Sequence, residues 1–141
     1  MARTVEFEKK RLALDAVAGG PNWANAGRAK YRVGQEVVHV RFCSNAAADG
    51  VSYAFNINPN TLSADYELLI CGRPSVWYLI PIDEIQHIYD SPNAYRDRSN
   101  SKLRIINMNT QDDQLLYGVG GYKLDCTDYY QATLANEPSA G

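Results

Sequence analysis

At 141 residues the chain is long enough to form one compact domain that buries roughly two-thirds of its unfolded surface. Its apolar share of 45% and charged share of 21% are ordinary for soluble globular proteins, and no run approaches the roughly 18 apolar residues of a membrane span. The net charge of −2 excludes a strong general attraction to nucleic acid, so any binding of phosphates has to come from a local patch.

The first residues and the cysteines indicate the compartment. The N-terminal sequence MARTVEFEKKRLALDAV mixes charged with apolar residues, so it lacks the apolar core of a secretory signal, and we expect a cytoplasmic protein without a membrane partner. Cys43, Cys71 and Cys126 are odd in number and far apart, which fits neither a disulfide framework nor a paired metal site. We therefore expect reduced, buried thiols.

The chain opens with a predicted amphipathic helix over residues 4–18, where apolar residues recur at helical intervals. Gly19, Gly20 and Pro21 end this helix, since glycine tolerates positive φ and proline cannot continue the hydrogen-bond ladder. The segment that follows, NWANAGRAKYRVGQ, predicts a strand, a turn and a second strand.

Residues 37–42 predict a strand that carries a polar pair. Because side chains alternate across a strand, His39 and Arg41 share one face, while Val38, Val40 and Phe42 share the other. A core strand does not normally carry such a pair. The pair therefore marks either a binding or chemical site or a hydrated sheet face.

Three more strands and a helix follow in the sequence. After a turn at Asp49-Gly50, residues 51–57 alternate strictly between larger apolar and smaller or polar side chains, which predicts a half-buried strand. Residues 65–72 are almost continuously apolar, the pattern of a strand covered on both faces, and residues 76–81 predict the next strand. Residues 82–90 predict a short helix with acidic residues in its first turn.

The remaining residues predict a polar loop over 91–101 and a late hairpin formed by residues 102–108 and 114–119. The last six residues, NEPSAG, are expected to fray. No internal repeat or linker divides the chain, so residues 1–141 are interpreted as a single domain. The predicted fold class is α/β, with a mixed central sheet of four to six strands on which the two helices pack.

The succession of SYAFNI, ADYELLI and VWYLIP, followed by the helix IDEIQHIYD, resembles the PD-(D/E)XK, or restriction-endonuclease-like, nuclease superfamily. The resemblance is closest to small members such as Holliday-junction nucleases and group I intron homing endonucleases, and it covers residues 37–90, a little over a third of the chain. It implies a restriction-endonuclease-like fold, DNA as a partner and a homo-oligomer. The matching segments are scaffold, and scaffold alone does not define chemistry.

The resemblance also implies a place for the active site, where this chain departs from the family pattern. Active members gather carboxylates and a lysine around Mg²⁺, a hard cation that prefers oxygen ligands. Here His39 and Arg41 stand in the corresponding register, and no Asp or Glu lies between Asp15 and Glu36. Arginine can hold a phosphate but cannot readily exchange a proton.

Two carboxylates could complete such a site. Glu36 is a metal-ligand candidate only if a β-bulge shifts the strand register, because it otherwise points to the face opposite His39. Glu6 on the first helix, or Glu8 in its place, is a catalytic candidate, as a helix glutamate is in some relatives. Neither restores the whole set, so Mg²⁺ is expected as a cofactor only if the protein is catalytic.

Two basic clusters are candidate nucleic-acid contacts. Side chains 28, 30 and 32 share a face if that segment is extended, which favours a basic strip, although a charged strand edge guarded against aggregation has the same pattern. The second cluster lies in a loop beside Tyr95, where an ordinary surface loop is the alternative. The candidate residues are Arg28, Lys30 and Arg32 in the first cluster and Arg96, Arg98 and Lys102 in the second.

Two functions from different classes remain open at this point. The first is a nuclease-fold protein that interacts with DNA, either as a divergent metal-dependent endonuclease or as a derivative that binds without cutting. The alternative is a non-enzymatic interaction module, an inhibitor or accessory factor, that docks a protein partner on a tyrosine-rich sheet face. Ten tyrosines and the slight negative charge favour the alternative, and the resemblance favours the first.

Overall fold

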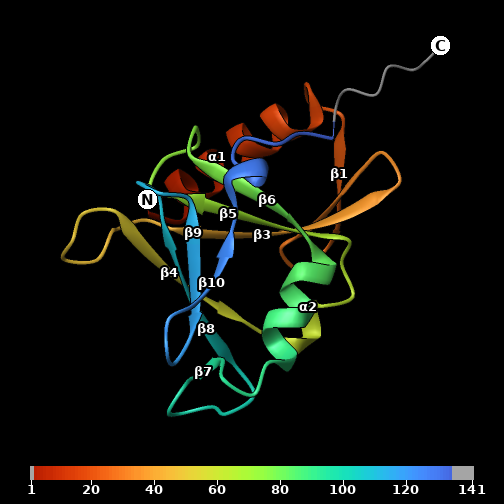
Figure 1. The fold of residues 1–141 in the computed structure, drawn as a ribbon. Helices are drawn as coiled ribbons and strands as arrows, with labels where there is room; N and C mark the ends of the chain where they lie inside the picture. Colours follow the sequence, from red (N-terminus) through yellow and green to blue (C-terminus); the bar gives the residue numbers. More distant parts are fainter. Residues whose placement is uncertain (1, 135–141) are drawn as a thin grey trace.

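The computed structural model describes residues 2–134, which form layers of helix and sheet (Figure 1). Residues 136–141, for which fraying was expected, lie outside the described residues. In chain order the helices and strands are α1 (Ala2–Ala18), β1 (Trp23–Gly27), β2 (Lys30–Val33), β3 (Glu36–Cys43), β4 (Ser52–Ile57), β5 (Tyr66–Cys71), β6 (Trp77–Pro81), α2 (Ile82–Asp90), β7 (Tyr95–Arg96), β8 (Arg104–Asn109), β9 (Gln114–Gly118) and β10 (Tyr122–Asp125). Two short 3-10 helices, η1 (Pro59–Thr61) and η2 (Thr127–Tyr129), complete the set.

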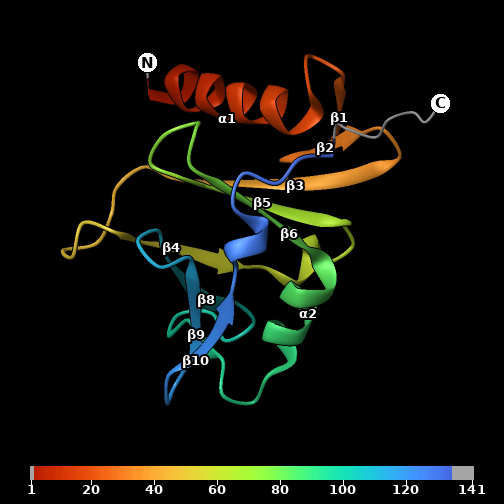
Figure 2. The same cartoon turned by 45° about the horizontal axis from the view of Figure 1, so that its top comes forward.

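The first sheet has the strand order β1-β2-β3-β5-β6. Its neighbours run antiparallel except for β3 and β5, which run parallel, so the sheet is mixed as expected. α1 covers one face of this sheet, as Figure 2 shows. Ala13, Leu14 and Val17 of α1 are buried there against β3 and β5, including Val38 and Val40.

The second sheet has the order β10-β9-β8-β4, with β7 paired to β8 at its side. It lies across the other face of the first sheet together with α2, and the space between them is filled by a second apolar cluster (Figure 2). Phe55 and Ile57 of β4, Ile106 of β8, and Ile85 and Ile88 of α2 are buried in this cluster. The face of the second sheet that points away from this cluster remains accessible.

The predicted helices and strands agree with the structure in position and type. The prediction of a single sheet is wrong. The helices begin and end within two residues of expectation, and the six segments predicted as strands between residues 23 and 81 are all present. The structure nevertheless divides its described strands between two sheets, because β4 leaves the first sheet and pairs with β8. The loop predicted over residues 91–101 also contains the two-residue strand β7.

The cysteines are free thiols in the structure. Cys71 and Cys126 are buried as expected, and burial raises the pKa of both thiols above the ordinary value. Cys43 is only partly buried, which corrects the expectation for that residue. Within residues 2–134, no helix is long and apolar enough to cross a membrane.

Candidate functional site

His39 and Arg41 lie side by side on the face of β3 that points toward the second sheet. The neighbouring Val38 and Val40 are buried against α1 on the opposite face, as strand alternation requires. His39 is buried with 5% of its surface exposed, while the Arg41 side chain keeps 20%. The pair therefore does not lie on a freely hydrated sheet face.

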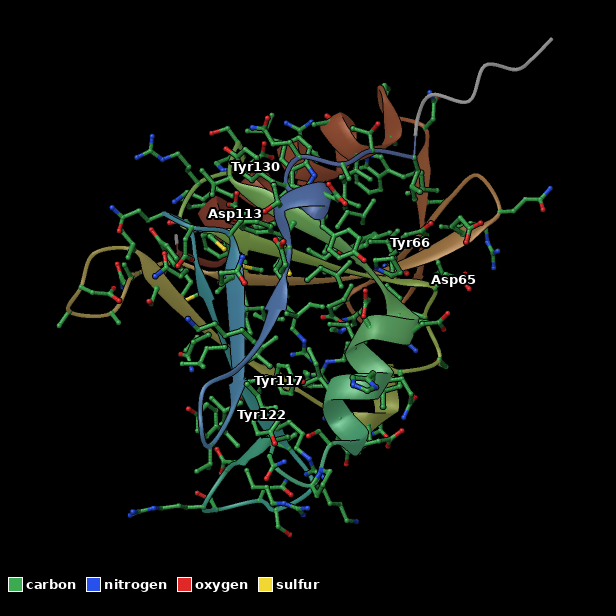
Figure 3. All side chains as sticks on the ribbon, viewed as in Figure 1. Asp65, Tyr66, Asp113, Tyr117, Tyr122 and Tyr130 are labelled. Carbon is green, nitrogen blue, oxygen red and sulfur yellow. The ribbon has the colours of Figure 1, made fainter. Side chains whose placement is uncertain are left out.

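Glu67 of β5 is the acidic partner of this pair. It stands directly beside His39 in the parallel register of β3 and β5, one residue after Tyr66, which Figure 3 labels. Its Oε2 lies 2.9 Å from His39 Nδ1 and 2.8 Å from Arg41 Nε. With 1% of its surface exposed, Glu67 is a buried carboxyl group, and a carboxyl group in such a place needs close polar partners. We call His39, Arg41 and Glu67 the charged cluster.

The charged cluster is not fully satisfied by its own members. The Arg41 Nε–H is not well aimed at Glu67, so this contact is an ion pair rather than a well-aligned hydrogen bond. The second oxygen, Glu67 Oε1, is buried and has no hydrogen-bond partner among the described residues. A buried acceptor without a donor is costly, so a donor from water or a ligand would stabilise this cluster.

A cleft of about 580 Å³ opens beside the charged cluster. One wall is the turn between β1 and β2. Ala29 in this turn has a positive φ of 57°, and Arg28 and Lys30 on either side of it both line the cleft. The other wall contains η1, whose first turn is capped by the Asn58 side chain. The lining residues that carry polar side chains are Arg28, Lys30, His39, Arg41, Asn58, Asn60 and Thr61. We call this the basic cleft.

Two side chains in the basic cleft are held by contacts across it. Arg41 Nη2 lies 3.4 Å from the Thr61 hydroxyl of η1, and Lys30 Nζ donates to the Ser63 hydroxyl at 3.0 Å. Of the cations at the cleft, only Arg41 contacts the charge of Glu67. The cleft thus combines fixed cations with amide and hydroxyl groups, which is the donor set that binds phosphate oxygens.

A second hollow, which we call the edge hollow, lies on the other side of Arg41. It runs along the part of β3 beyond the end of β2, between α1 and β4, and it shares His39 and Arg41 with the basic cleft. Glu6 lines this hollow, where it forms an ion pair with Lys10 at 3.3 Å. The structure therefore brings Glu6 to the same region as the predicted pair, although its charge is already paired.

Glu36 does not join this region. β2 and β3 pair in continuous register from Glu36 to His39, so no bulge turns Glu36 toward the pair. Arg28 belongs to a turn rather than to a strand, so side chains 28, 30 and 32 do not form the continuous strip that an extended segment would give. Arg32 lines a different hollow, beside Trp23.

The second basic cluster is divided as well. Arg96 and Arg98 line a hollow of about 960 Å³ at the far side of the second sheet, which we call the loop hollow. Asp97 stands between them, but its carboxylate accepts from the backbone N–H groups of Ser99 and Asn100 and is held within its own turn. Lys102 is exposed and does not line this hollow.

The donor set around the charged cluster does not fit Mg²⁺, the ion that the resemblance implies. Magnesium takes oxygen ligands, usually including one or two carboxylates. Glu67 already faces an arginine and a histidine, and Glu36 lies on the other face of the sheet. Among the described residues, no three His, Cys, Asp or Glu side chains come close enough together to hold a metal ion.

Glu67 is a candidate site residue that the sequence analysis did not select. A glutamate inside a strand that is otherwise apolar and covered on both faces was a usable signal, because it has to find a buried partner. Comparisons with protein-family models, with curated proteins and with solved structures gave no match for this chain. Its function has therefore to be inferred from the charged cluster and the surfaces around it.

Proposed function

We propose that this protein is a nuclease-fold, DNA-interacting protein that binds a backbone phosphate in the basic cleft. The observation that carries the proposal is the fixation of Arg41 in the cleft wall by Glu67 on one side and Thr61 on the other. An arginine held in this way loses little side-chain freedom when it binds, and its planar fork matches two phosphate oxygens. Arg28 and Lys30 add charge from the opposite wall.

The sequence resemblance supports DNA as the source of the phosphate. It rests on a strand with a polar pair, an alternating strand, a buried strand, an aromatic strand and a helix, which correspond to β3, β4, β5, β6 and α2. The same resemblance is the ground for proposing a homo-oligomer. Within this function, the donor set favours binding without metal-dependent cutting, and Mg²⁺-dependent cleavage is the other outcome that an assay has to test.

The rival function, docking of a protein partner on a tyrosine-rich sheet face, has less support. Most tyrosine side chains are buried or partly buried, and of the ten only Tyr122 and Tyr130 are exposed. Figure 3 shows Tyr122 beside Tyr117, with ring centroids 6.0 Å apart, so even this exposed ring packs on a neighbour. The tyrosines therefore stabilise the core more than they form a docking surface.

Binding of fluorescein-labelled DNA, followed by anisotropy at several salt concentrations, tests the proposal. We expect binding that weakens steeply between about 0.05 and 0.2 M salt, because phosphate contacts release counterions. The double variant Arg28→Ala/Lys30→Ala should lose most of this affinity, whereas Arg73→Ala, an exposed cation in the turn between β5 and β6, should not. If the protein does not bind DNA, or if its affinity does not change with salt, the proposed function is contradicted and docking of a protein partner becomes the favoured function.

A plasmid-nicking assay with Mg²⁺ or Mn²⁺ separates a cutter from a binder. We expect no nicking at protein concentrations that saturate the DNA, because the charged cluster presents a single, already paired carboxylate. If the protein nicks DNA in the presence of metal, and Arg41→Ala and Glu67→Gln lose this activity, the protein is a metal-dependent endonuclease instead.

A further inference from the structure

The outer face of the second sheet connects the basic cleft with the loop hollow. Ala54 and Asn56 of β4 line the edge hollow, which shares Arg41 with the basic cleft. In the antiparallel register, Ala54 lies beside Asn107 of β8 and Asn56 lies beside Ile105. Asn107 and Ile105 in turn line the loop hollow. The basic cleft, the edge hollow and the loop hollow thus form one path from the cleft to the loop.

Arginine and lysine side chains stand at both ends of this path, and the edge hollow between them carries the ion pair of Glu6 and Lys10. Arg28, Lys30 and Arg41 stand at one end, and Arg96 and Arg98 stand at the other. Figure 1 shows the loop around β7 at the bottom of the second sheet, at the opposite end of the molecule from α1. A polyanion that spans the path would meet cations at both ends, although the whole chain has a net charge of −2.

The middle of the path carries short amide side chains. Asn56 and Asn107 point away from the core, because their neighbours Phe55 and Ile106 are buried in it. Among the described residues, neither amide takes part in a side-chain hydrogen bond, whereas Asn109 next to them caps its own turn. Asparagine both donates and accepts, so two such amides can bind the exposed edges of unpaired bases.

The shape of the path favours one strand over a duplex. Proteins read a duplex with an element that enters a groove, such as a helix or a protruding ribbon. Here the surface is a sheet face hollowed between α1, β4 and the loop around β7, so it accommodates a chain that lies along it.

We propose that the outer face of the second sheet binds a single-stranded segment of nucleic acid, with phosphates on the cations at each end and bases on Asn56 and Asn107. This inference rests on the proposed function, since it assumes that the basic cleft holds a backbone phosphate. It adds that the bound DNA is unpaired, that the loop around β7 is part of the same site, and that its bases face the sheet.

Anisotropy with three labelled DNAs tests this inference. The probes are an oligothymidine of about twelve nucleotides, a trinucleotide that fills only the cleft, and a duplex of the longer length. For Arg96→Ala/Arg98→Ala we expect the longer strand to bind roughly 25-fold more weakly at about 0.1 M salt, with the salt slope lower by about 1.4, because each lost phosphate contact contributes about 0.7. Binding of the trinucleotide should not change.

A matched central variant tests the path itself. Asn107→Asp keeps the size of the side chain and adds a negative charge, so it should weaken the longer strand and leave the trinucleotide unchanged. Arg73→Ala is the control for the loss of an exposed cation elsewhere. The Asn107→Asp thermal melting curve should match the parent, because Asn107 lies outside the apolar core.

The possible failures are distinguishable. In the first, Arg28→Ala/Lys30→Ala abolishes binding while the loop and Asn107 variants bind the longer strand normally. In that case the outer face of the second sheet does not bind DNA, and the phosphate site in the basic cleft is retained. If the duplex binds more tightly than the single strand, the assignment to unpaired DNA is overturned. If the parent protein binds none of the three DNAs, the proposed function itself fails.

Discussion

At the residue scale, the decisive feature is a glutamate buried inside the protein. Glu67 lies between two nitrogen-bearing side chains, and it fixes both of them at the edge of the cleft. Strand alternation alone predicts that the His39 and Arg41 side chains lie on the same face of β3. The partner could not be predicted in this way, because it depends on which strand pairs with β3 and in which register, and neither is a local property of the sequence.

Removal of Glu67 should be far more damaging than removal of an exposed carboxylate. Glu67→Ala leaves Arg41 and His39 without their acceptor, and we expect it to lower the free energy of unfolding by about 3 kcal/mol. Glu67→Gln keeps the shape of the side chain and removes the carboxylate, so it should lower the free energy of unfolding by less. Urea denaturation measures both, with Glu6→Ala on the exposed side of α1 as a control that changes stability by less than about 0.5 kcal/mol. Equal stability of Glu67→Ala and Glu6→Ala would show that the charged cluster does not hold β3 to β5.

At the element scale, strands and helices could be predicted because their signals are local. The strict alternation of β4, the continuous apolar run of β5 and the acidic first turn of α2 each indicate one type of element. The two-residue strand β7 carries no such signal, since it is too short to show a period. The departure of β4 into a second sheet also has no local signal, because β4 pairs with β8, which lies much later in the chain.

The two sheets are linked by a buried tyrosine. The Tyr78 hydroxyl of β6 donates to Asp113, in the turn between β8 and β9, at 2.5 Å, and Figure 3 shows Asp113 near Tyr130, whose ring packs on Tyr78. Burial and the Asp113 carboxylate raise the pKa of Tyr78 above its ordinary value, so the hydroxyl remains a donor at neutral pH. This hydrogen bond therefore ties the last strand of the first sheet to the hairpin of the second.

Loss of this hydroxyl should weaken the fold. For Tyr78→Phe we expect the free energy of unfolding to fall by about 1.5–3 kcal/mol, as for other hydrogen bonds to a charged group. Tyr122→Phe, which changes an exposed ring, is the control. Because the folded pKa of Tyr78 is raised, its contribution is present below the unfolded pKa of about 10 and is lost as the pH rises above it. In urea titrations, a difference between the two variants that does not shrink above that pH would contradict this assignment.

At the scale of the whole molecule, the arrangement of the layers explains where the surfaces lie. α1 covers one face of the first sheet, and the second sheet lies across the other (Figure 2). His39 and Arg41 of the charged cluster line the basic cleft and the edge hollow at the border of these layers. The sequence predicted both basic clusters, but only the fold shows that four of the six predicted cations do not line the basic cleft. Arg28 and Lys30 flank Arg41, Arg96 and Arg98 share another hollow, and Arg32 and Lys102 lie apart from both.

The central claim, that the basic cleft holds a phosphate of DNA, can be measured at the imidazole rings. The protein has two histidines, so their ring signals are readily distinguished by NMR: His39 lies in the cleft wall, and His87 is exposed on α2. When an oligothymidine strand is titrated into the labelled protein, we predict that the His39 signals move with saturation, that those of His87 stay in place, and that Arg28→Ala/Lys30→Ala abolishes the movement. His39 signals that remain unchanged while the DNA is bound would place the phosphate elsewhere and contradict the account.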